Sequence, residues 1–141
     1  MANLTIEDNF PAGIRVLVID DDRTSLHVVC MMLESCGYKV TKCTSGKEGL
    51  EMLRQEGQFD IVLTDVHMPD MDGFQLLEHV GLEMDLPVVM LSVDSSHENV
   101  VKGLKHGACD YLIKPVQREE LEKIGEHVIT WRRANAGIFD D

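Results

Sequence analysis

Five short apolar runs recur along the chain, and polar stretches of helical length separate them. Most of the runs are continuous in Val, Ile and Leu rather than alternating with polar residues, which is typical of parallel strands covered on both faces. We therefore predict strands at residues 14–19, 38–43, 59–64, 87–92 and 111–114.

The segments between these runs carry the periodicity of amphipathic helices. In the first, apolar residues follow an i, i+3, i+4, i+7 pattern from Leu26 to Leu33, with Asp22 or Thr24 as a candidate N-cap and Gly37 as a stop. Further helices are predicted at residues 47–55, 74–83, 98–106 and 119–131. Strict alternation of strand and helix predicts a doubly wound α/β domain, in which helices cover both faces of a five-stranded parallel sheet.

Composition limits the protein class. The 141 residues are 44% hydrophobic and 27% charged, which suits one globular domain, here placed at residues 13–133 between loose segments at 1–12 and 134–141. No apolar run approaches the roughly 18 residues of a membrane span, and the first residues lack a signal-peptide pattern, so we expect an intracellular protein and no membrane. The net charge of -12 opposes direct nucleic-acid binding and favours a cation or a basic partner.

Cysteine and histidine do not form a metal site in this sequence. The four cysteines show no C-x-x-C pair, and we expect them to be reduced and mostly buried. His97 and Glu98 are not followed by a second histidine at metalloprotease spacing.

Polar residues of a particular set follow four of the five predicted strands. The aspartate triplet 20–22 ends the first strand, Asp65 the third, Ser92 the fourth and Lys114 the fifth. The carboxyl ends of parallel strands share one edge of the sheet, so these residues should converge there. Each alone is explained by a helix cap, a turn or a solvated lysine, but four such strand ends in one sheet favour a functional site.

Adjacent carboxylates are unfavourable in a cleft unless a cation offsets their charge. Two or three of them can hold Mg²⁺, while a lysine and a serine hydroxyl can bind phosphoryl oxygens. The set suits phosphoryl transfer with Asp65 as the nucleophile that forms an aspartyl-phosphate.

The motifs VLVIDDD, TDVHMPDMDG, VVMLS and DYLIKP stand in the order and at the spacing of a response-regulator receiver domain, which the chain resembles over about residues 13–131. The resemblance implies a flavodoxin-like (βα)5 fold with strand order 2-1-3-4-5. The run from Asp65 to Ser92 is most similar to plant type-B response regulators, which act in cytokinin signalling and transcription in the nucleus.

By this resemblance Asp65 is the phosphoacceptor of a regulatory domain that is not an enzyme. Asp21, Asp65 and the backbone carbonyl of His67 would bind Mg²⁺ directly, and Asp20 would act through water. Asp22 would fall outside this set.

The resemblance also implies that Lys114 and Ser92 bind the phosphoryl group, that Tyr111 moves from an exposed to a buried position as the readout, and that the Lys114–Pro115 peptide is cis. Val93 is larger than the residue common after the switch hydroxyl, which leaves the dephosphorylation rate open. The phosphodonor would be a histidine-containing phosphotransfer protein or a histidine kinase, and a homodimer is left open.

One alternative comes from an enzyme class. The stretch from Asp20 to Thr24 spells D-x-D-x-T after an apolar strand, the nucleophile motif of haloacid-dehalogenase-type phosphohydrolases, with Asp20 as nucleophile. That interpretation leaves Asp65 without a role, and no acidic pair ends a strand after Lys114. We rank it behind the receiver interpretation.

Overall fold

The structure, a computed structural model, describes residues 13–56 and 59–137. Its sheet holds five parallel strands in the order β2-β1-β3-β4-β5. The strands are β1 (Arg15–Ile19), β2 (Lys39–Cys43), β3 (Ile61–Asp65), β4 (Val88–Ser92) and β5 (Asp110–Ile113). The predicted strands lie within one or two residues of these, and the strand order implied by the resemblance is confirmed.

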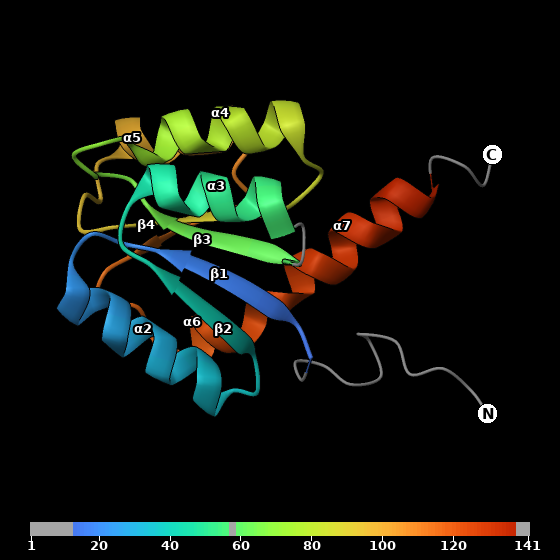
Figure 1. Ribbon diagram of the computed structural model, residues 1–141, viewed down its shortest axis with the longest axis horizontal. Coiled ribbons are helices and arrows are strands. Elements are labelled where there is room, and N and C mark those ends of the chain that lie inside the picture. The colour runs from blue at the N-terminus through green and yellow to red at the C-terminus, as the bar shows by residue number, and fades with distance from the viewer. Residues whose placement is uncertain (1–12, 57–58, 138–141) are drawn as a thin grey trace.

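Helices cover both faces of the sheet, as the unbroken apolar strands require (Figure 1). The helices are α2 (Arg23–Ser35), α3 (Gly46–Glu56), α4 (Gly73–Glu83), α5 (His97–Lys105), α6 (Arg118–Lys123) and α7 (Gly125–Gly137). One core cluster joins the sheet to α2, α6 and α7, and the other joins it to α3 and α4, with Val100 of α5 at its margin. Strands β1, β3 and β4 are buried almost throughout, whereas the edge strand β2 exposes two lysines.

The last helix differs from the sequence prediction, because it is broken into α6 and α7. The buried hydroxyl of Tyr38 donates to the carbonyl of Leu121 at 2.9 Å and accepts the backbone N–H of Gly125 at 3.1 Å. These two backbone groups would bond directly to each other in an unbroken α-helix. The tyrosine hydroxyl is therefore inserted into the helical hydrogen-bond series, a recognised cause of a bend.

The helix α7 also extends farther than predicted, to Gly137 rather than to Trp131. Its last turns carry no apolar stripe, which is the signal that the prediction used, yet Ala134 and Ala136 are good helix formers. The expected loose segment at 1–12 and the last residues, 138–141, lie outside the described part of the chain. Among the helices that are described, none is both long and apolar enough to cross a membrane.

The strand order determines where in the sheet the candidate site lies. The chain leaves β1 toward β2 on one side of the sheet and later returns to β3 on the other side, so the order reverses between β1 and β3. A crevice forms at such a reversal, outside the carboxyl ends of the strands. The residues that follow β1 and β3 are the aspartates of the predicted site.

Candidate functional site

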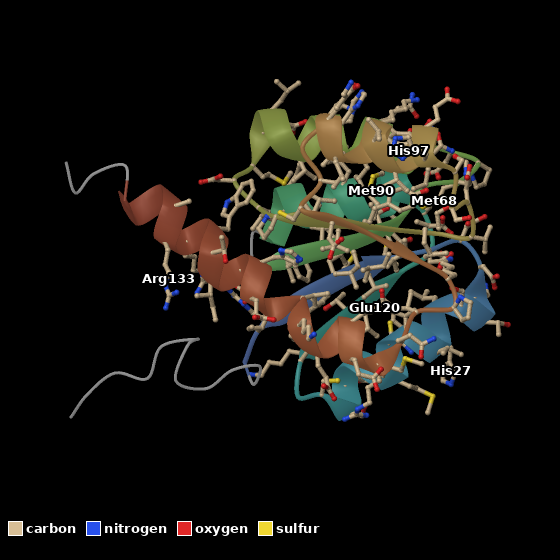
Figure 2. All side chains as sticks on the ribbon, turned by 180° about the vertical axis from the view of Figure 1, so that it is seen from behind. His27, Met68, Met90, His97, Glu120 and Arg133 are labelled. Carbon is tan, nitrogen blue, oxygen red and sulfur yellow. The ribbon has the colours of Figure 1, made fainter. Side chains whose placement is uncertain are left out.

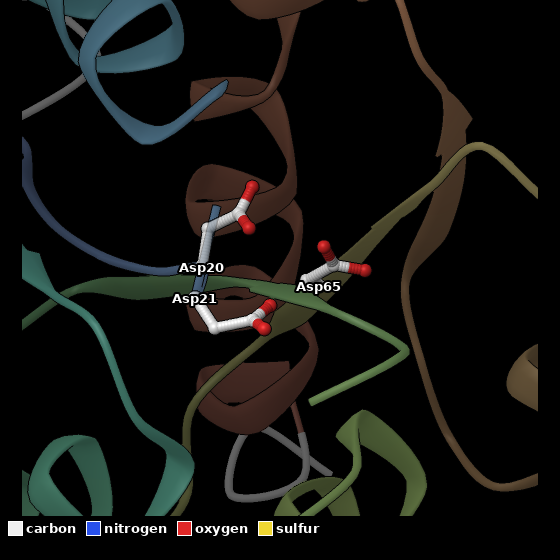
Figure 3. Close-up of side chains that lie close together, drawn as sticks. All are labelled: Asp20, Asp21 and Asp65. Carbon is white, nitrogen blue, oxygen red and sulfur yellow. The ribbon is translucent and has the colours of Figure 1, made fainter. Parts of the chain in front are cut away.

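Three carboxylates converge at the carboxyl ends of β1 and β3 (Figure 3). Asp20, Asp21 and Asp65 each offer an oxygen, and these oxygens all lie within 4.8 Å of one another. Asp20 is 1% exposed and Asp65 8% exposed, whereas Asp21 faces solvent. Burial raises the pKa of the Asp65 carboxyl above its ordinary value, although Lys114 favours the charged form.

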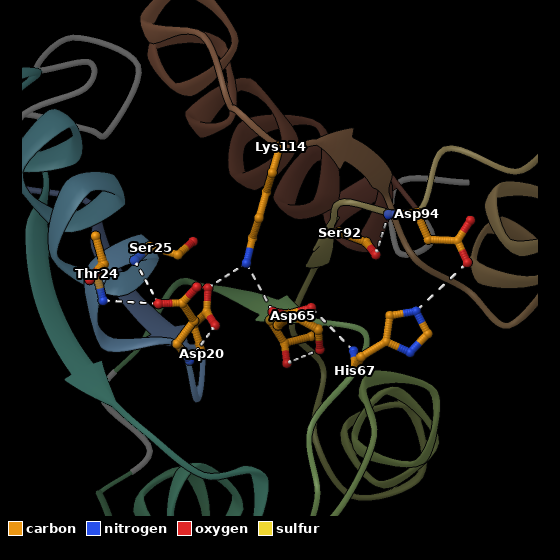
Figure 4. A network of polar contacts seen from close by, with 10 residues as sticks. Asp20, Thr24, Ser25, Asp65, His67, Ser92, Asp94 and Lys114 are labelled. Carbon is orange, nitrogen blue, oxygen red and sulfur yellow. Dashed lines mark hydrogen bonds and ion pairs between the residues drawn. The ribbon is translucent and has the colours of Figure 1, made fainter.

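Lys114 reaches this cluster from the end of β5. Its ammonium donates to Asp20 Oδ2 at 2.6 Å and to Asp65 Oδ2 at 2.9 Å (Figure 4). Burial opposes the charge on this lysine, but the two carboxylates outweigh that effect and raise its pKa. The Lys114–Pro115 peptide bond is cis. One cation thus sits between two buried carboxylates at the point where phosphoryl chemistry was predicted.

The loop between β3 and α4 is held tightly against the site. The backbone N–H of His67 donates to Asp65 Oδ1 at 3.1 Å, which fixes the carboxylate. Gly73 allows the close return of the chain, because a Cβ there would lie 2.6 Å from the carbonyl oxygen of Asp65. Asp70 accepts the backbone N–H of Lys47 at 2.9 Å and so ties the loop to the start of α3.

A second network joins the fourth strand to Tyr111. The buried Ser92 Oγ accepts the backbone N–H of Asp94 at 3.0 Å, so its own proton is available to an acceptor in the crevice. The carbonyl of Asp94 accepts the hydroxyl of Tyr111 at 2.8 Å, and the tyrosine ring is buried. His67 Nε2 lies 3.7 Å from Asp94 Oδ2, which brings the two loops together across the site.

The donor set fits a hard divalent cation. Mg²⁺ takes oxygen ligands and is held in proteins by one or two carboxylates, with water and phosphate oxygens filling its other positions. Asp21 and Asp65 would supply such carboxylates, and the exposure of Asp21 leaves room for water. Asp20 points its Oδ2 at Lys114 and accepts the Asp22 N–H with Oδ1, so its oxygens are already partly engaged.

The structure brings Asp20, Asp21, Asp65, Ser92 and Lys114 to one edge of the sheet. Asp22 lies apart from them as the N-cap of α2, where its side chain accepts the backbone N–H groups of Thr24 and Ser25. Of the two candidate caps, the structure selects Asp22.

Sequence reasoning did not single out Asp94 or Asp70. Their roles depend on contacts with segments distant in the sequence: Asp94 with Tyr111, and Asp70 with the start of α3. Gly73 could be recognised from the sequence as the end of a tight loop that leads into a helix. No spacing rule identifies the two aspartates.

Comparison with protein families gives one match over most of the chain. The model of the response regulator receiver domain matches residues 16–126. The two-component response regulator ARR2 of Arabidopsis thaliana is 58% identical over 127 residues, and ORR21 of Oryza sativa subsp. indica is 60% identical over 121 residues. These alignments cover 89% and 85% of this chain but 19% and 18% of the relatives, so the chain spans about a fifth of their length.

Solved structures show the same fold at lower identity. A CheY-like receiver domain from Methanospirillum hungatei JF-1 superposes with a TM-score of 0.77 at 35% identity, covering 86% of this chain and 98% of that one. The chemotaxis response regulator CheY4 of Vibrio cholerae gives a TM-score of 0.73 at 31% identity, covering 82% and 98%. The phosphohydrolase alternative is not favoured by these matches.

Proposed function

Because the chain belongs to the response regulator receiver domains, regulatory units of two-component phosphorelays, we propose that Asp65 is its phosphoacceptor. The observation that carries this assignment is the position of Lys114, whose ammonium lies between Asp20 and Asp65 at the reversal of strand order. Among the aspartates of the cluster, Asp65 is the one that both contacts Lys114 and receives the His67 N–H. This arrangement orients the Asp65 carboxylate and places a positive charge beside it, which can stabilise a transferred phosphoryl group.

In the proposed transfer, the phosphorus–nitrogen bond of a phosphohistidine donor breaks as a carboxylate oxygen of Asp65 bonds to phosphorus. The imidazole leaves with the electron pair of the broken bond. Lys114 moves from Asp65 Oδ2 to a phosphoryl oxygen, and Ser92 donates its free proton to another. Mg²⁺, held by Asp21, Asp65 and the His67 carbonyl with Asp20 acting through water, would neutralise charge on the transferring group.

The phosphoryl group on Asp65 then favours one arrangement of the hydrogen-bond network that joins Ser92, Asp94 and Tyr111. When Ser92 turns toward the phosphoryl group, the loop that carries Asp94 is drawn with it, because the Asp94 N–H bonds to Ser92 Oγ. The same residue accepts the Tyr111 hydroxyl, so the movement reaches the outer strand. Tyr111 is already buried here, the position proposed for the active readout.

The wider role follows from the plant relatives and is likewise proposed. The donor is a histidine-containing phosphotransfer protein or a histidine kinase, and the output is transcription in cytokinin signalling, in the nucleus. The domain promotes its own phosphorylation and dephosphorylation without turning over a separate substrate. Direct binding of nucleic acid by this segment is disfavoured by the net charge of -12.

Intact mass tests the phosphoacceptor. After incubation with phosphoramidate and Mg²⁺, the protein should gain one phosphoryl group, and Asp65→Asn should gain none. Asp72→Asn is the matched control, because it lies in the same loop and asparagine replaces aspartate well as an N-cap. Labelling that survives in Asp65→Asn would refute the assignment. Hydrolysis of an aryl phosphate that is lost in Asp20→Asn would instead support the phosphohydrolase alternative.

A further inference from the structure

The first turn of α3 is in close contact with the loop between β3 and α4. The carboxylate of Asp70 in this loop accepts the backbone N–H of Gly46 at 3.3 Å and that of Lys47 at 2.9 Å. N–H groups at the start of a helix have no carbonyl partner within the helix, so Asp70 supplies their acceptor. Burial opposes the charge on Asp70, but hydrogen bonds from the backbone N–H groups of α3 and of its own loop outweigh that effect and lower its pKa. A charged group therefore binds the loop to the helix.

The absence of a side chain at Gly46 lets the loop lie directly on α3. A Cβ at this position would be 2.9 Å from the carbonyl oxygen of Met71, a separation at which the loop would have to shift. Met68 of the same loop, labelled in Figure 2, is 8% exposed and belongs to the core cluster that joins the sheet to α3 and α4. The loop is thus held by the hydrogen bonds to Asp70 and by the packing of Met68 and Met71.

The segment held in this way carries the proposed backbone ligand of the metal ion. His67 lies between Val66, whose carbonyl accepts the Gly73 N–H at 2.8 Å, and the buried Met68. Its own side chain is exposed, so the position of its carbonyl depends on how its neighbours are anchored. Mg²⁺ demands near-ideal octahedral geometry with oxygens at about 2.0 to 2.1 Å, whereas Ca²⁺ accepts flexible geometry at about 2.3 to 2.6 Å. A displaced carbonyl should therefore weaken Mg²⁺ binding more than Ca²⁺ binding.

We propose that Asp70, together with Gly46, positions the His67 carbonyl and thereby sets the preference of the site for Mg²⁺ over Ca²⁺. This inference rests on the proposed function and assigns a positioning role to a residue outside the carboxylate cluster. A loop released from α3 would leave the carboxylates of Asp21 and Asp65 in the cluster. Divalent ions would then still bind, but the site would select less strongly between them.

The competing explanation is that Asp70 only stabilises the end of α3. Ser45 offers a matched control, because it is the N-cap of the same helix: its carbonyl accepts the Gly49 N–H at 3.0 Å and its Oγ accepts the Glu48 N–H at 3.1 Å. Ser45→Ala weakens this helix end but leaves the hydrogen bonds accepted by Asp70 in place. If only the helix end matters, Ser45→Ala and Asp70→Ala should change metal binding alike.

The test measures both affinities from the amide chemical shifts of residues 65–67 during titration with MgCl₂ or CaCl₂ at constant ionic strength. Asp70→Ala should raise the dissociation constant for Mg²⁺ by about tenfold, since loss of a group that orients a metal ligand costs about 10- to 100-fold in affinity. The constant for Ca²⁺ should rise by less than about threefold, because its geometry is flexible. The ratio of the two constants cancels the loss of one negative charge, which affects both divalent ions alike.

Three further variants make the comparison specific. Gly46→Ala, whose added Cβ would press on Met71, should shift the ratio in the same direction as Asp70→Ala. Asp70→Asn keeps one acceptor oxygen and should give an intermediate ratio, which decides the matter if Asp70→Ala does not fold. Ser45→Ala should leave the ratio unchanged. Phosphorylation of Asp70→Ala by phosphoramidate should be slow at low Mg²⁺ and should recover at saturating Mg²⁺, because Asp65 and Lys114 are intact.

An unchanged ratio in either Asp70→Ala or Gly46→Ala would overturn the inference. An equal change in Ser45→Ala would also overturn it, since the stability of the helix end would then explain the effect. A phosphorylation rate in Asp70→Ala that saturating Mg²⁺ does not restore would show that Asp70 acts otherwise than through the ion. Failure of phosphoramidate to label Asp65 in the unmodified protein would instead refute the proposed function.

Discussion

Replacing Asp21 by asparagine should stabilise the protein in the absence of Mg²⁺ and should remove the stabilisation that Mg²⁺ gives. Asp21, Asp20 and Asp65 hold oxygens within 4.8 Å of one another. At that separation, and in the water-like dielectric of the exposed Asp21, repulsion by each neighbouring carboxylate is about 1 kcal/mol. Attraction to Lys114 offsets part of this. The expected net gain for Asp21→Asn is about 1 kcal/mol.

Mg²⁺ should make the unmodified protein more stable than Asp21→Asn, the reverse of the order expected without the ion. At about ten times its dissociation constant, an ion that binds only the folded state adds about 1.4 kcal/mol to stability. The unmodified protein should gain this amount, and Asp21→Asn should gain much less, because a ligand of the proposed site is lost. Phosphorylation by phosphoramidate should be largely abolished in the same variant.

Urea denaturation with and without Mg²⁺ measures both effects, and a change of 1 kcal/mol moves the midpoint by about 0.5 M. The control is Asp22→Asn, which removes the same charge one residue away while keeping a good N-cap for α2. An equal gain in Asp22→Asn would show that only the net charge matters. Undiminished Mg²⁺ stabilisation in Asp21→Asn would refute the proposed ligand set.

Two further predictions concern the framework of the site. Gly73→Ala should lower the free energy of unfolding by about 2 kcal/mol and slow phosphorylation, because the added Cβ would lie 2.6 Å from the carbonyl oxygen of Asp65. Gly81→Ala, whose Cβ would meet nothing within 4 Å, should raise the free energy of unfolding by about 1 kcal/mol. Equal urea midpoints for the two variants would contradict this. Asp60→Asn should lower the free energy of unfolding by about 2 kcal/mol at neutral pH. Burial opposes the charge of Asp60, but its hydrogen bonds from Arg15 outweigh that and lower its pKa, so its contribution is present above about pH 4 and is lost as the pH falls further. A difference from the unmodified protein that does not shrink in acid would refute this account.

The sequence determined the fold to within a few residues at most element ends. Continuous apolar runs require cover on both faces, and alternation with helices leaves few connections that satisfy this requirement. It also determined which residues gather at the site, because parallel strands bring their carboxyl ends together whatever the details of packing. Asp65, Ser92 and Lys114 could therefore be identified before any coordinates.

Contacts between segments far apart in the sequence decided the rest. The break between α6 and α7 depends on the hydroxyl of Tyr38, which lies more than eighty residues earlier and leaves no trace in the local helical pattern. The link from Ser92 through Asp94 to Tyr111 likewise depends on how two loops settle against each other. Periodicity reports which face of an element is buried, but a polar group that finds its partner across the fold is specified only by tertiary packing.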